Sequence, residues 1–268
     1  VAHDVVATDL EELDVTDADA VAGALRDAGP DHVVHLAAWT DVDACERDPE
    51  RADRVNRVGT TNVAAAAAAV GADLLYVSTD YVFDGRKTSG PYTEDDEPAP
   101  LNIYGKTKLA GEQALEASGA RALIFRTSWV YGARGSNFLL TMRRLFRERD
   151  ALSIVDDQIG APTWSRMLAE CTAQVLHRVL CGDLDLDEVK GTYHLTGGGQ
   201  TSWFGFACAI LGANKSECKL TPIRSTEYPA PAKRPAYSVL DNSRFQQTFG
   251  LKMPDWHLSL AQCLEEID

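Results

Sequence analysis

The sequence lacks features that would place it in several large classes of protein. No apolar run reaches the roughly 18 residues that a membrane-spanning helix needs, and the stretch Ala64 to Ala69 is short enough to be a packed helix. The cysteines show neither a C-x-x-C pair nor the spacing of a metal site. Scattered cysteines of this kind are typical of reduced thiols in a cytoplasmic protein. They are Cys45, Cys171, Cys181, Cys208, Cys218 and Cys263.

Positive charge is also scarce. Lysine and arginine together number 26 against 40 aspartates and glutamates, which gives a formal net charge of −14. Nucleic-acid binding needs basic patches that neutralise phosphates, so this composition argues against a nucleic-acid partner. Two explanations of the acidity stay open: an ordinary acidic cytoplasmic enzyme, or adaptation to high salt, where screening relieves self-repulsion.

The chain does contain a regular alternation of apolar strands and helices. Strands are expected at 5–9, 32–36, 74–78 and 122–127, and helices at 16–28, 50–70, from about 102 onward and at 137–149. This alternation is typical of parallel strands joined by right-handed crossovers. We therefore expect an α/β, Rossmann-like doubly wound parallel sheet in residues 1–150, which form the dinucleotide-binding domain.

The rhythm changes after about residue 150. Short strands at 152–155 and 193–195 mix with helices near 163–180 and 202–211, and the stretch from 222 to 235 is rich in proline. Residues 151–268 are therefore expected to form mainly a smaller substrate-binding lobe, with some helices returning to the sheet.

One element of a dinucleotide-binding fold is missing from the sequence. Such a fold opens with a strand and a glycine-rich turn whose amides bind the pyrophosphate, and no such turn precedes Val5. Gly197 to Gly199 follow a late strand and are expected to form an ordinary turn. The expectation is that about 20–30 residues of a βαβ unit are absent from this sequence, with natural loss as the alternative. Cofactor binding by these residues alone is then expected to be weak.

A block of residues and a spaced pair carry the strongest chemical signal. The block runs from Ser78 to Gly85, and the pair is Tyr104 and Lys108. Residues four apart share a helix face, so the Lys108 ammonium is expected to lie beside the Tyr104 phenol and to lower its pKa from about 10. Tyr104 can then protonate a carbonyl oxygen that accepts hydride at carbon, and Thr79 can hold that oxygen. Alone, a Tyr-x-x-x-Lys spacing is more often an exposed helical pair.

Several longer segments resemble the dTDP-4-dehydrorhamnose reductase family of the extended short-chain dehydrogenase/reductase superfamily. The resemblance covers nearly the whole chain, and the blocks Thr79 to Gly85 and Asp157 to Thr163 are its most specific parts. The matching segments are 37–43, 78–85, 100–112, 125–131, 137–138, 157–163 and 229–235.

The resemblance implies a reaction and a set of site residues. NADPH or NADH would reduce the C4 keto group of dTDP-4-dehydro-β-L-rhamnose to dTDP-L-rhamnose. Tyr104 would donate the proton, Lys108 would tune Tyr104 and hold the nicotinamide ribose, and Thr79 would bind the reacting oxygen. The cofactor-contacting positions would be Asp9, Asp14, Val15, Ala37, Ala38, Trp39, Thr40, Tyr104 and Lys108. The substrate-contacting positions would be Thr79, Asp80, Tyr81, Tyr104, Trp129, Asn137 and Arg234. The resemblance also allows a homodimer and Mg²⁺, without assigning ligands to a metal.

These assignments have simpler alternatives. Asp9 could be a helix cap or a surface acid, Trp129 a core aromatic, Asn137 a helix cap, and Arg234 a surface charge or a partner of a diphosphate. His32 and His35 are expected to be structural.

For the function, a related sugar-nucleotide reductase, epimerase or dehydratase stays open. A dehydratase would carry an Asp-Glu pair after the active-site threonine, whereas Thr79 is followed by Asp80 and Tyr81. A regulatory subunit like the β-subunit of methionine adenosyltransferase, which is not a catalyst, also stays open.

Overall fold

A central sheet of four parallel strands organises the chain. The computed structural model describes residues 3–213 and 216–267. The strands are β1 (His32–His35), β2 (Asp73–Thr79), β3 (Ala122–Thr127) and β8 (Gly191–His194), in the spatial order β1-β2-β3-β8. Every neighbouring pair in this sheet is parallel. The predicted doubly wound α/β fold is confirmed.

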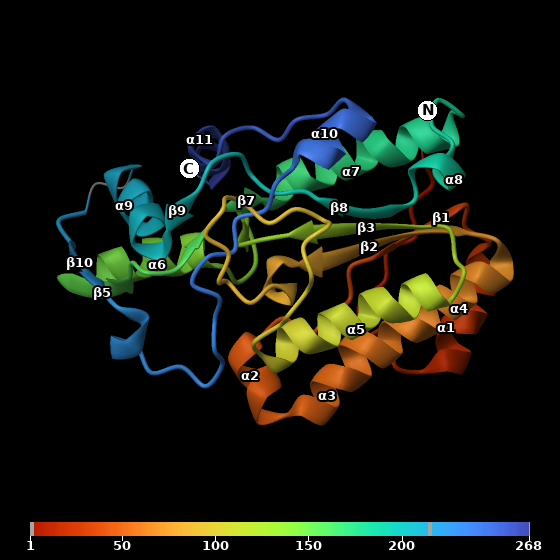
Figure 1. Ribbon diagram of the computed structural model, residues 1–268, viewed down its shortest axis with the longest axis horizontal. Helices are drawn as coiled ribbons and strands as arrows, with labels where there is room; N and C mark the ends of the chain where they lie inside the picture. Colours follow the sequence, from red (N-terminus) through yellow and green to blue (C-terminus); the bar gives the residue numbers. More distant parts are fainter. Residues whose placement is uncertain (1–2, 214–215, 268) are drawn as a thin grey trace.

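Helices cover both faces of the sheet (Figure 1). One face carries α1 (Ala18–Ala28), α4 (Gly59–Val70) and α5 (Ile103–Ala117), with α2 (Val42–Arg47) and α3 (Pro49–Asp53) at its edge. The other face carries α7 (Ser165–Leu180), α8 (Leu186–Val189) and α10 (Ser243–Phe249). Successive strand residues point to opposite faces, so Leu74 and Tyr76 pack with α1 and α4 while Leu75 packs with α7 and α10.

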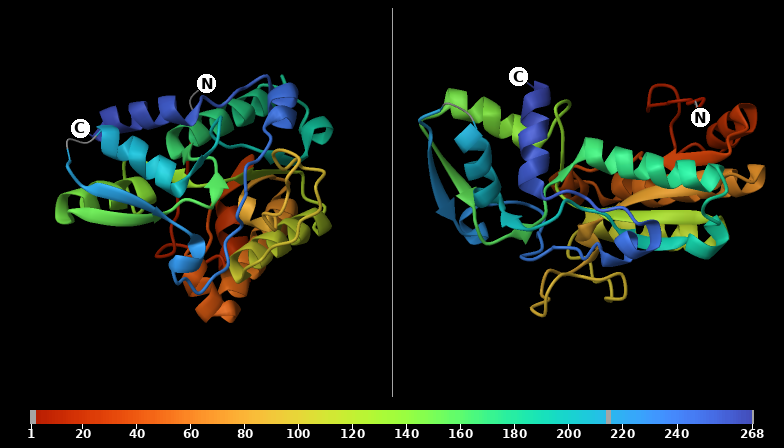
Figure 2. Two further views of the ribbon diagram at one scale, coloured as in Figure 1. Left: turned by 60° about the vertical axis from the view of Figure 1, so that its left-hand side comes forward. Right: turned by 90° about the horizontal axis from the view of Figure 1, so that it is seen from above.

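A smaller lobe lies beyond the carboxyl ends of β2 and β3 (Figures 1 and 2). It contains α6 (Phe138–Glu148), α9 (Trp203–Ala213), α11 (Trp256–Ile267) and the parallel pair β5 (Ala151–Val155) and β10 (Lys219–Ile223). Its own core includes Leu139, Phe146, Phe206 and Leu260. Two short pairs lie near it, β4 (Val130–Tyr131) with β7 (Thr163–Trp164) and β6 (Ile159–Gly160) with β9 (Thr201–Ser202).

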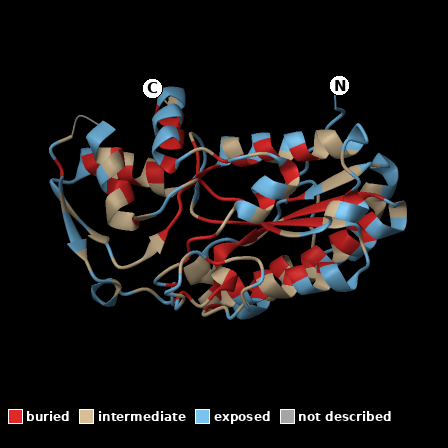
Figure 3. Cartoon of the chain, turned by 45° about the horizontal axis from the view of Figure 1, so that its top comes forward, coloured by how far each residue is buried: buried red, intermediate tan, exposed pale blue. Residues whose placement is uncertain are grey.

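The residues after 150 are divided between the two cores. The strand expected near Tyr193 is β8, which pairs with β3 in the main sheet, and α7 and α10 cover that sheet. The strands β5 and β10 and the helices α9 and α11 belong to the lobe. Figure 3 shows buried residues following the sheet and the inner helix faces in both parts.

The expected strand at Val5 to Asp9 is wrong. These residues form no ladder with any strand of the described chain, and Val5 and Val6 are 77% and 73% exposed. A strand needs a neighbour to pair its backbone groups, and β1, the edge of the sheet, pairs only with β2 within the described residues. Apolar pattern alone therefore did not make this segment a strand.

Local signals set most helix ends as expected. The Asp17 side chain accepts from the backbone N–H of Asp19 and Ala20 and begins α1, and Gly29, at φ 53°, ends it in the left-handed conformation that glycine favours. The helix expected at 50–70 is broken into α3, a π-helical turn (Arg54–Val58) and α4.

Candidate active site

A cavity of about 770 Å³ lies at the carboxyl ends of β1, β2 and β3. In open parallel sheets, ligands bind in the crevice at this edge. Helix α5 supplies one wall, α7 another, and α9 of the smaller lobe contributes one side chain. Its lining comprises Val34, Leu36, Ala38, Thr40, Val42, Val77, Ser78, Thr79, Asp80, Tyr81, Tyr104, Lys108, Thr127, Ser128, Trp129, Val130, Ser165, Leu168, Ala169, Thr172, Ala173, Leu176 and Trp203.

Tyr104 and Thr79 meet in this cavity from two different elements. Asn102 caps α5 by accepting from the backbone N–H of Gly105 at 2.8 Å, which places Tyr104 in the first turn. Thr79 ends β2. The Thr79 hydroxyl lies close enough to the phenol to interact with it, and this interaction opposes the burial that raises the pKa of Tyr104. The fold therefore brings these two hydroxyls from separate elements into one cavity.

Gly105 allows this close approach. A Cβ at Gly105 would overlap the backbone carbonyl oxygen of Tyr81 and lie 2.9 Å from its carbonyl carbon. The first turn of α5 therefore packs directly against the turn that follows Thr79.

Lys108 enters the cavity one turn after Tyr104 and is almost fully buried. Its Nζ donates to the carbonyl oxygen of Val77 at 2.7 Å and lies 4.0 Å from the ring centroid of Tyr76. Burial lowers the pKa of Lys108 to about 7, while the charge of Glu112 opposes this change.

The expected lowering of the Tyr104 pKa is wrong for this structure. Burial is the largest influence and raises the pKa of Tyr104 above its usual value. The Lys108 ammonium donates to the Val77 carbonyl oxygen. Burial removes water from around the phenol, and this loss of solvation disfavours the charged phenolate. Tyr104 is therefore a protonated phenol at neutral pH.

Asp80 and Tyr81 follow Thr79 into the same wall. Asp80 is 2% exposed and accepts from the Thr79 hydroxyl at 3.1 Å. Burial raises the pKa of Asp80 to about 7. The ring of Tyr81 meets the ring of Tyr104 edge-on, with centroids 5.9 Å apart.

Trp129 forms an aromatic wall with Trp203. The two indoles stack with centroids 3.6 Å apart and 5° between planes. Trp129 has φ 46°, the only positive φ of a non-glycine residue in the described chain. A Cβ at Gly160 would lie 2.6 Å from Nε1 of Trp129, so this glycine makes room for the indole. Strained backbone of this kind is concentrated at functional sites.

The fold places some of the predicted cofactor positions at the cavity and others away from it. Ala38 and Thr40 line the cavity, and the rest of this loop, Ala37 and Trp39, lies beside it. The side chain of Asn56 holds the loop by accepting from the backbone N–H of Trp39 at 2.8 Å.

The predicted cofactor positions nearest the N-terminus lie outside the lining of the cavity. Asp9 is exposed and its carboxylate accepts from the backbone N–H of Leu10. Asp14 accepts from the backbone N–H of Thr16, which lowers the pKa of Asp14. Val15 packs on α4, where its carbonyl accepts from the Asn62 side chain at 3.0 Å.

Two predicted substrate residues have protein partners. Asn137 caps α6 by accepting from the backbone N–H of Leu140 at 3.1 Å. Arg234 donates through both terminal nitrogens to Asp43, at 3.2 and 2.9 Å. Neither side chain lines the cavity, so the simpler reading of Asn137 as a helix cap describes its contacts in this structure.

Sequence reasoning did not identify several residues in and around the site, among them Asn56, Glu112, Thr127 and Trp203. Only Glu112 carried a usable signal, since it lies four residues after Lys108 and shares its helix face. The others enter through contacts between distant segments, which no local pattern encodes.

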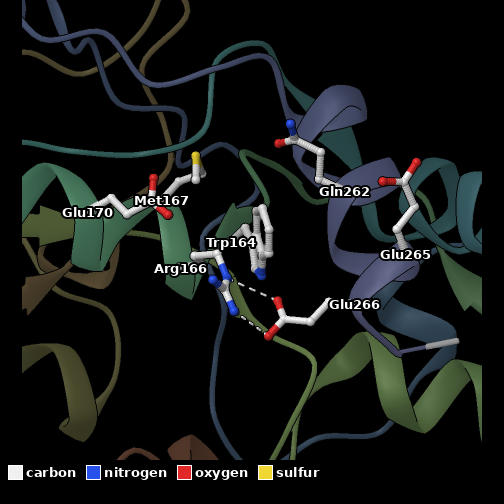
Figure 4. A pocket seen from close by; sticks show the side chains of 7 residues that line it. All are labelled: Trp164, Arg166, Met167, Glu170, Gln262, Glu265 and Glu266. Atoms are coloured by element: carbon white, nitrogen blue, oxygen red, sulfur yellow. Dashed lines mark hydrogen bonds and ion pairs between the residues drawn. The ribbon is translucent and has the colours of Figure 1, made fainter.

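A second, open hollow lies between α7 and α11 (Figure 4). In it Arg166 reaches across to Glu266, with Nη2 to Oε1 at 2.5 Å and Nε to Oε2 at 3.1 Å. The described residues contain no cluster of three or more acidic, histidine or cysteine side chains that could hold a metal ion. Within the same residues, no helix has both the length and the apolar character needed to cross a membrane.

Comparison with known proteins decides the family. The family described as RmlD substrate binding domain matches residues 1–268. A dTDP-4-dehydrorhamnose reductase of Burkholderia thailandensis is 43% identical over 265 residues, which cover 96% of this chain and 89% of that protein. One from Escherichia coli K12 is 42% identical over 273 residues, covering 100% and 89%. The chain belongs to the dTDP-4-dehydrorhamnose reductase family.

A solved structure of this reductase family has the same fold. The enzyme of Bacillus anthracis, in complex with NADP, matches with a TM-score of 0.90 and 37% identity over 97% of this chain and 89% of the other. The resemblance predicted from the segments around Thr79 and Tyr104 is thereby confirmed.

Proposed function

We propose that this protein reduces the C4 keto group of dTDP-4-dehydro-β-L-rhamnose to give dTDP-L-rhamnose, with NADPH or NADH as the hydride source. Family membership supports the reaction, and the structure of the Bacillus anthracis relative with NADP supports the cofactor class. The observation that carries the proposal is the placement of Thr79, Tyr104 and Lys108 together in the lining of one cavity.

The two hydroxyls have complementary roles in this proposal. Tyr104 is protonated at neutral pH because burial raises its pKa, so it has a proton to give to the C4 oxygen. Thr79 would turn its hydroxyl from the Asp80 carboxyl to donate a hydrogen bond to the same oxygen and hold it against the phenol. Lys108, one turn along α5, favours the phenolate that remains after the proton has left.

The residues of the cavity fit a nicotinamide cofactor. The hydroxyl of Thr127 is buried and has no hydrogen-bond partner among the described residues, and it lies in the same lining as Lys108. These polar groups suit the ribose next to the nicotinamide. When bound, the nicotinamide supplies the hydride. Ala38 and Thr40 would hold the cofactor beside it, and Asp9, Asp14, Val15, Ala37 and Trp39 remain predicted contacts.

The sugar is assigned to the side of the cavity formed by Asp80, Tyr81 and Trp129. Stacking on Trp203 fixes the Trp129 indole, which offers a flat apolar surface to a deoxysugar. Asn137 and Arg234 stay predictions for the diphosphate, and Arg234 would have to share or leave its pair with Asp43. The homodimer and the cytoplasmic location also stay predictions.

A substrate panel tests this function. The purified full-length protein would be incubated with NADPH or NADH and a set of nucleotide-linked 4-keto sugars, and loss of absorbance by the reduced cofactor would be followed. We expect turnover with the dTDP-linked 4-keto-6-deoxy sugar. Binding of cofactor without turnover of any sugar would favour a regulatory subunit, and isomerisation without net oxidation would favour an epimerase.

Replacing Lys108 with methionine is expected to weaken cofactor binding and to alter the pH profile. The ammonium is charged below the Lys108 pKa of about 7, so wild-type turnover should fall as the pH rises through this region. Lys108→Met carries no charge at any pH, so this step should vanish and turnover below it should be about tenfold lower or more, one pKa unit of proton affinity being a tenfold change. An unchanged profile with unchanged cofactor affinity by calorimetry would remove Lys108 from the site.

A further inference from the structure

A buried carboxylate lies directly behind the proposed catalytic groups. Glu112, on α5, is 2% exposed. It accepts from Nε of Arg126 at 3.0 Å and from Nη2 of Arg126 at 2.6 Å, and it also accepts from the hydroxyl of Ser78. Such charge-assisted, bidentate bonds hold a carboxylate in one place.

Each partner of Glu112 is the sequence neighbour of a cavity residue. Ser78 precedes Thr79 on β2, and Arg126 precedes Thr127 on β3. Glu112 itself follows Lys108 by one helical turn, so the two share a face of α5. One carboxylate therefore joins the helix and the two strands that present the polar groups of the cavity.

We propose that Glu112 is a positioning residue, which favours the charged form of Lys108 from the same face of α5 and fixes α5 against β2 and β3 at the cavity. The purpose that this arrangement serves, proton transfer to a keto sugar, rests on the proposed function. The arrangement itself rests on the contacts of Glu112.

The groups around Lys108 give Glu112 its electrostatic role. The phenol ring of Tyr76 and the imidazole of His35 face the ammonium, and the neutral phenol of Tyr104 lies in the same cavity lining. His35 is uncharged near neutrality, because burial and the Lys108 charge lower its pKa to about 3. Arg126 is a permanent cation. Glu112 therefore supplies the negative charge that favours the Lys108 ammonium, against the burial that disfavours it.

A purely structural role makes a different prediction. Buried ion pairs are often replaceable by apolar residues of similar volume without loss of stability. If Glu112 and Arg126 only fill space, an apolar substitute should keep the site working and leave Lys108 unchanged. The conservative variant Glu112→Gln alone leaves the Arg126 cation uncompensated and risks misfolding, so a compensated variant is needed.

The test therefore uses the triple variant Ser78→Ala/Glu112→Leu/Arg126→Met, which removes the whole cluster and leaves none of its members unpaired. Its fold would be verified by circular dichroism and thermal melting. The ionisation of Lys108 would be read by competitive labelling with acetic anhydride across pH, with mass spectrometry of the peptide that contains Lys108. The matched control is Arg121→Met, which breaks the ion pair of Arg121 with Asp73 at the opposite end of the same strands.

We expect the labelling midpoint of Lys108 in the triple variant to move to lower pH by about one pH unit or more. The charge that favours the Lys108 ammonium is that of Glu112, so its loss should outweigh the removal of the Arg126 cation. Turnover should fall by about 10²-fold, the cost of small misplacement of reacting groups, with little change in KM for the sugar nucleotide. Arg121→Met should leave both the midpoint and turnover unchanged.

A folded triple variant with the wild-type midpoint would overturn the proposal. The labelling result also separates this proposal from the proposed function. If the wild-type protein turned over no keto sugar and the midpoint still moved, the reductase assignment would fail and the role of Glu112 toward Lys108 would stand.

Discussion

Turnover of the nucleotide-linked keto sugar should fall by about 10²–10⁴-fold when Tyr104 is replaced by phenylalanine, the range that general acid catalysis contributes. The phenol is the proton donor nearest the oxygen that Thr79 would hold, and burial keeps it protonated at neutral pH. Phenylalanine keeps the ring and its edge-on contact with Tyr81. The fold and the affinity for the cofactor should therefore be unchanged, as circular dichroism and calorimetric titration would report.

Tyr193→Phe is the matched control for this variant. Tyr193 lies on β8, outside the cavity lining, and its hydroxyl donates to the carbonyl oxygen of Val189 at 2.7 Å. Its loss should leave turnover unchanged. Near-normal turnover by Tyr104→Phe would exclude Tyr104 as the proton donor and would direct attention to the buried carboxyl of Asp80, whose pKa is about 7.

The second large effect is expected from a single added methyl group at Gly105. The Cβ of Gly105→Ala would overlap the Tyr81 carbonyl oxygen and lie 2.9 Å from the carbonyl carbon. The backbone of α5 must therefore move away from the backbone at Tyr81. Overpacking of this kind costs about 1–3 kcal/mol, measurable by urea unfolding. The shift would move Tyr104 away from Thr79, and misplacement by about 1 Å can cost about 10²-fold in rate.

Gly23→Ala provides the comparison for Gly105→Ala. Gly23 lies inside α1, where none of the described residues comes within 4 Å of an added Cβ. This change should stabilise the protein by about 0.5–1 kcal/mol, because alanine loses less conformational freedom in a helix than glycine does. If Gly105→Ala behaved like Gly23→Ala in both stability and turnover, the close packing of α5 on the turn after Thr79 would not govern the site.

Much of the fold could be predicted from the sequence, because helix caps and apolar strand patterns indicate the same elements that the sheet requires. Asp17, Gly29 and Asn102 begin or end helices through their own side chain or backbone, and such caps are visible in sequence. The strands at 74–78 and 122–127 are apolar on both sides because helices cover both faces of the sheet. Val5 to Asp9 has the same apolar character and remained unpaired, because a strand also requires a partner that its own residues do not specify.

The candidate site could be predicted only in part, because contacts between distant segments are not specified by the residues of either segment. The sequence alone determined that Tyr104 and Lys108 share a helix face and that Thr79 ends a strand, since both follow from local periodicity. Tertiary structure decided that Thr79 and Tyr104 meet in one cavity, that Trp129 stacks on Trp203, and that Asn137 and Arg234 have protein partners. It also decided the pKa changes of Tyr104 and Lys108, because burial is a property of the whole fold. Burial raises the pKa of Tyr104, and at Lys108 it outweighs the charge of Glu112 four residues away.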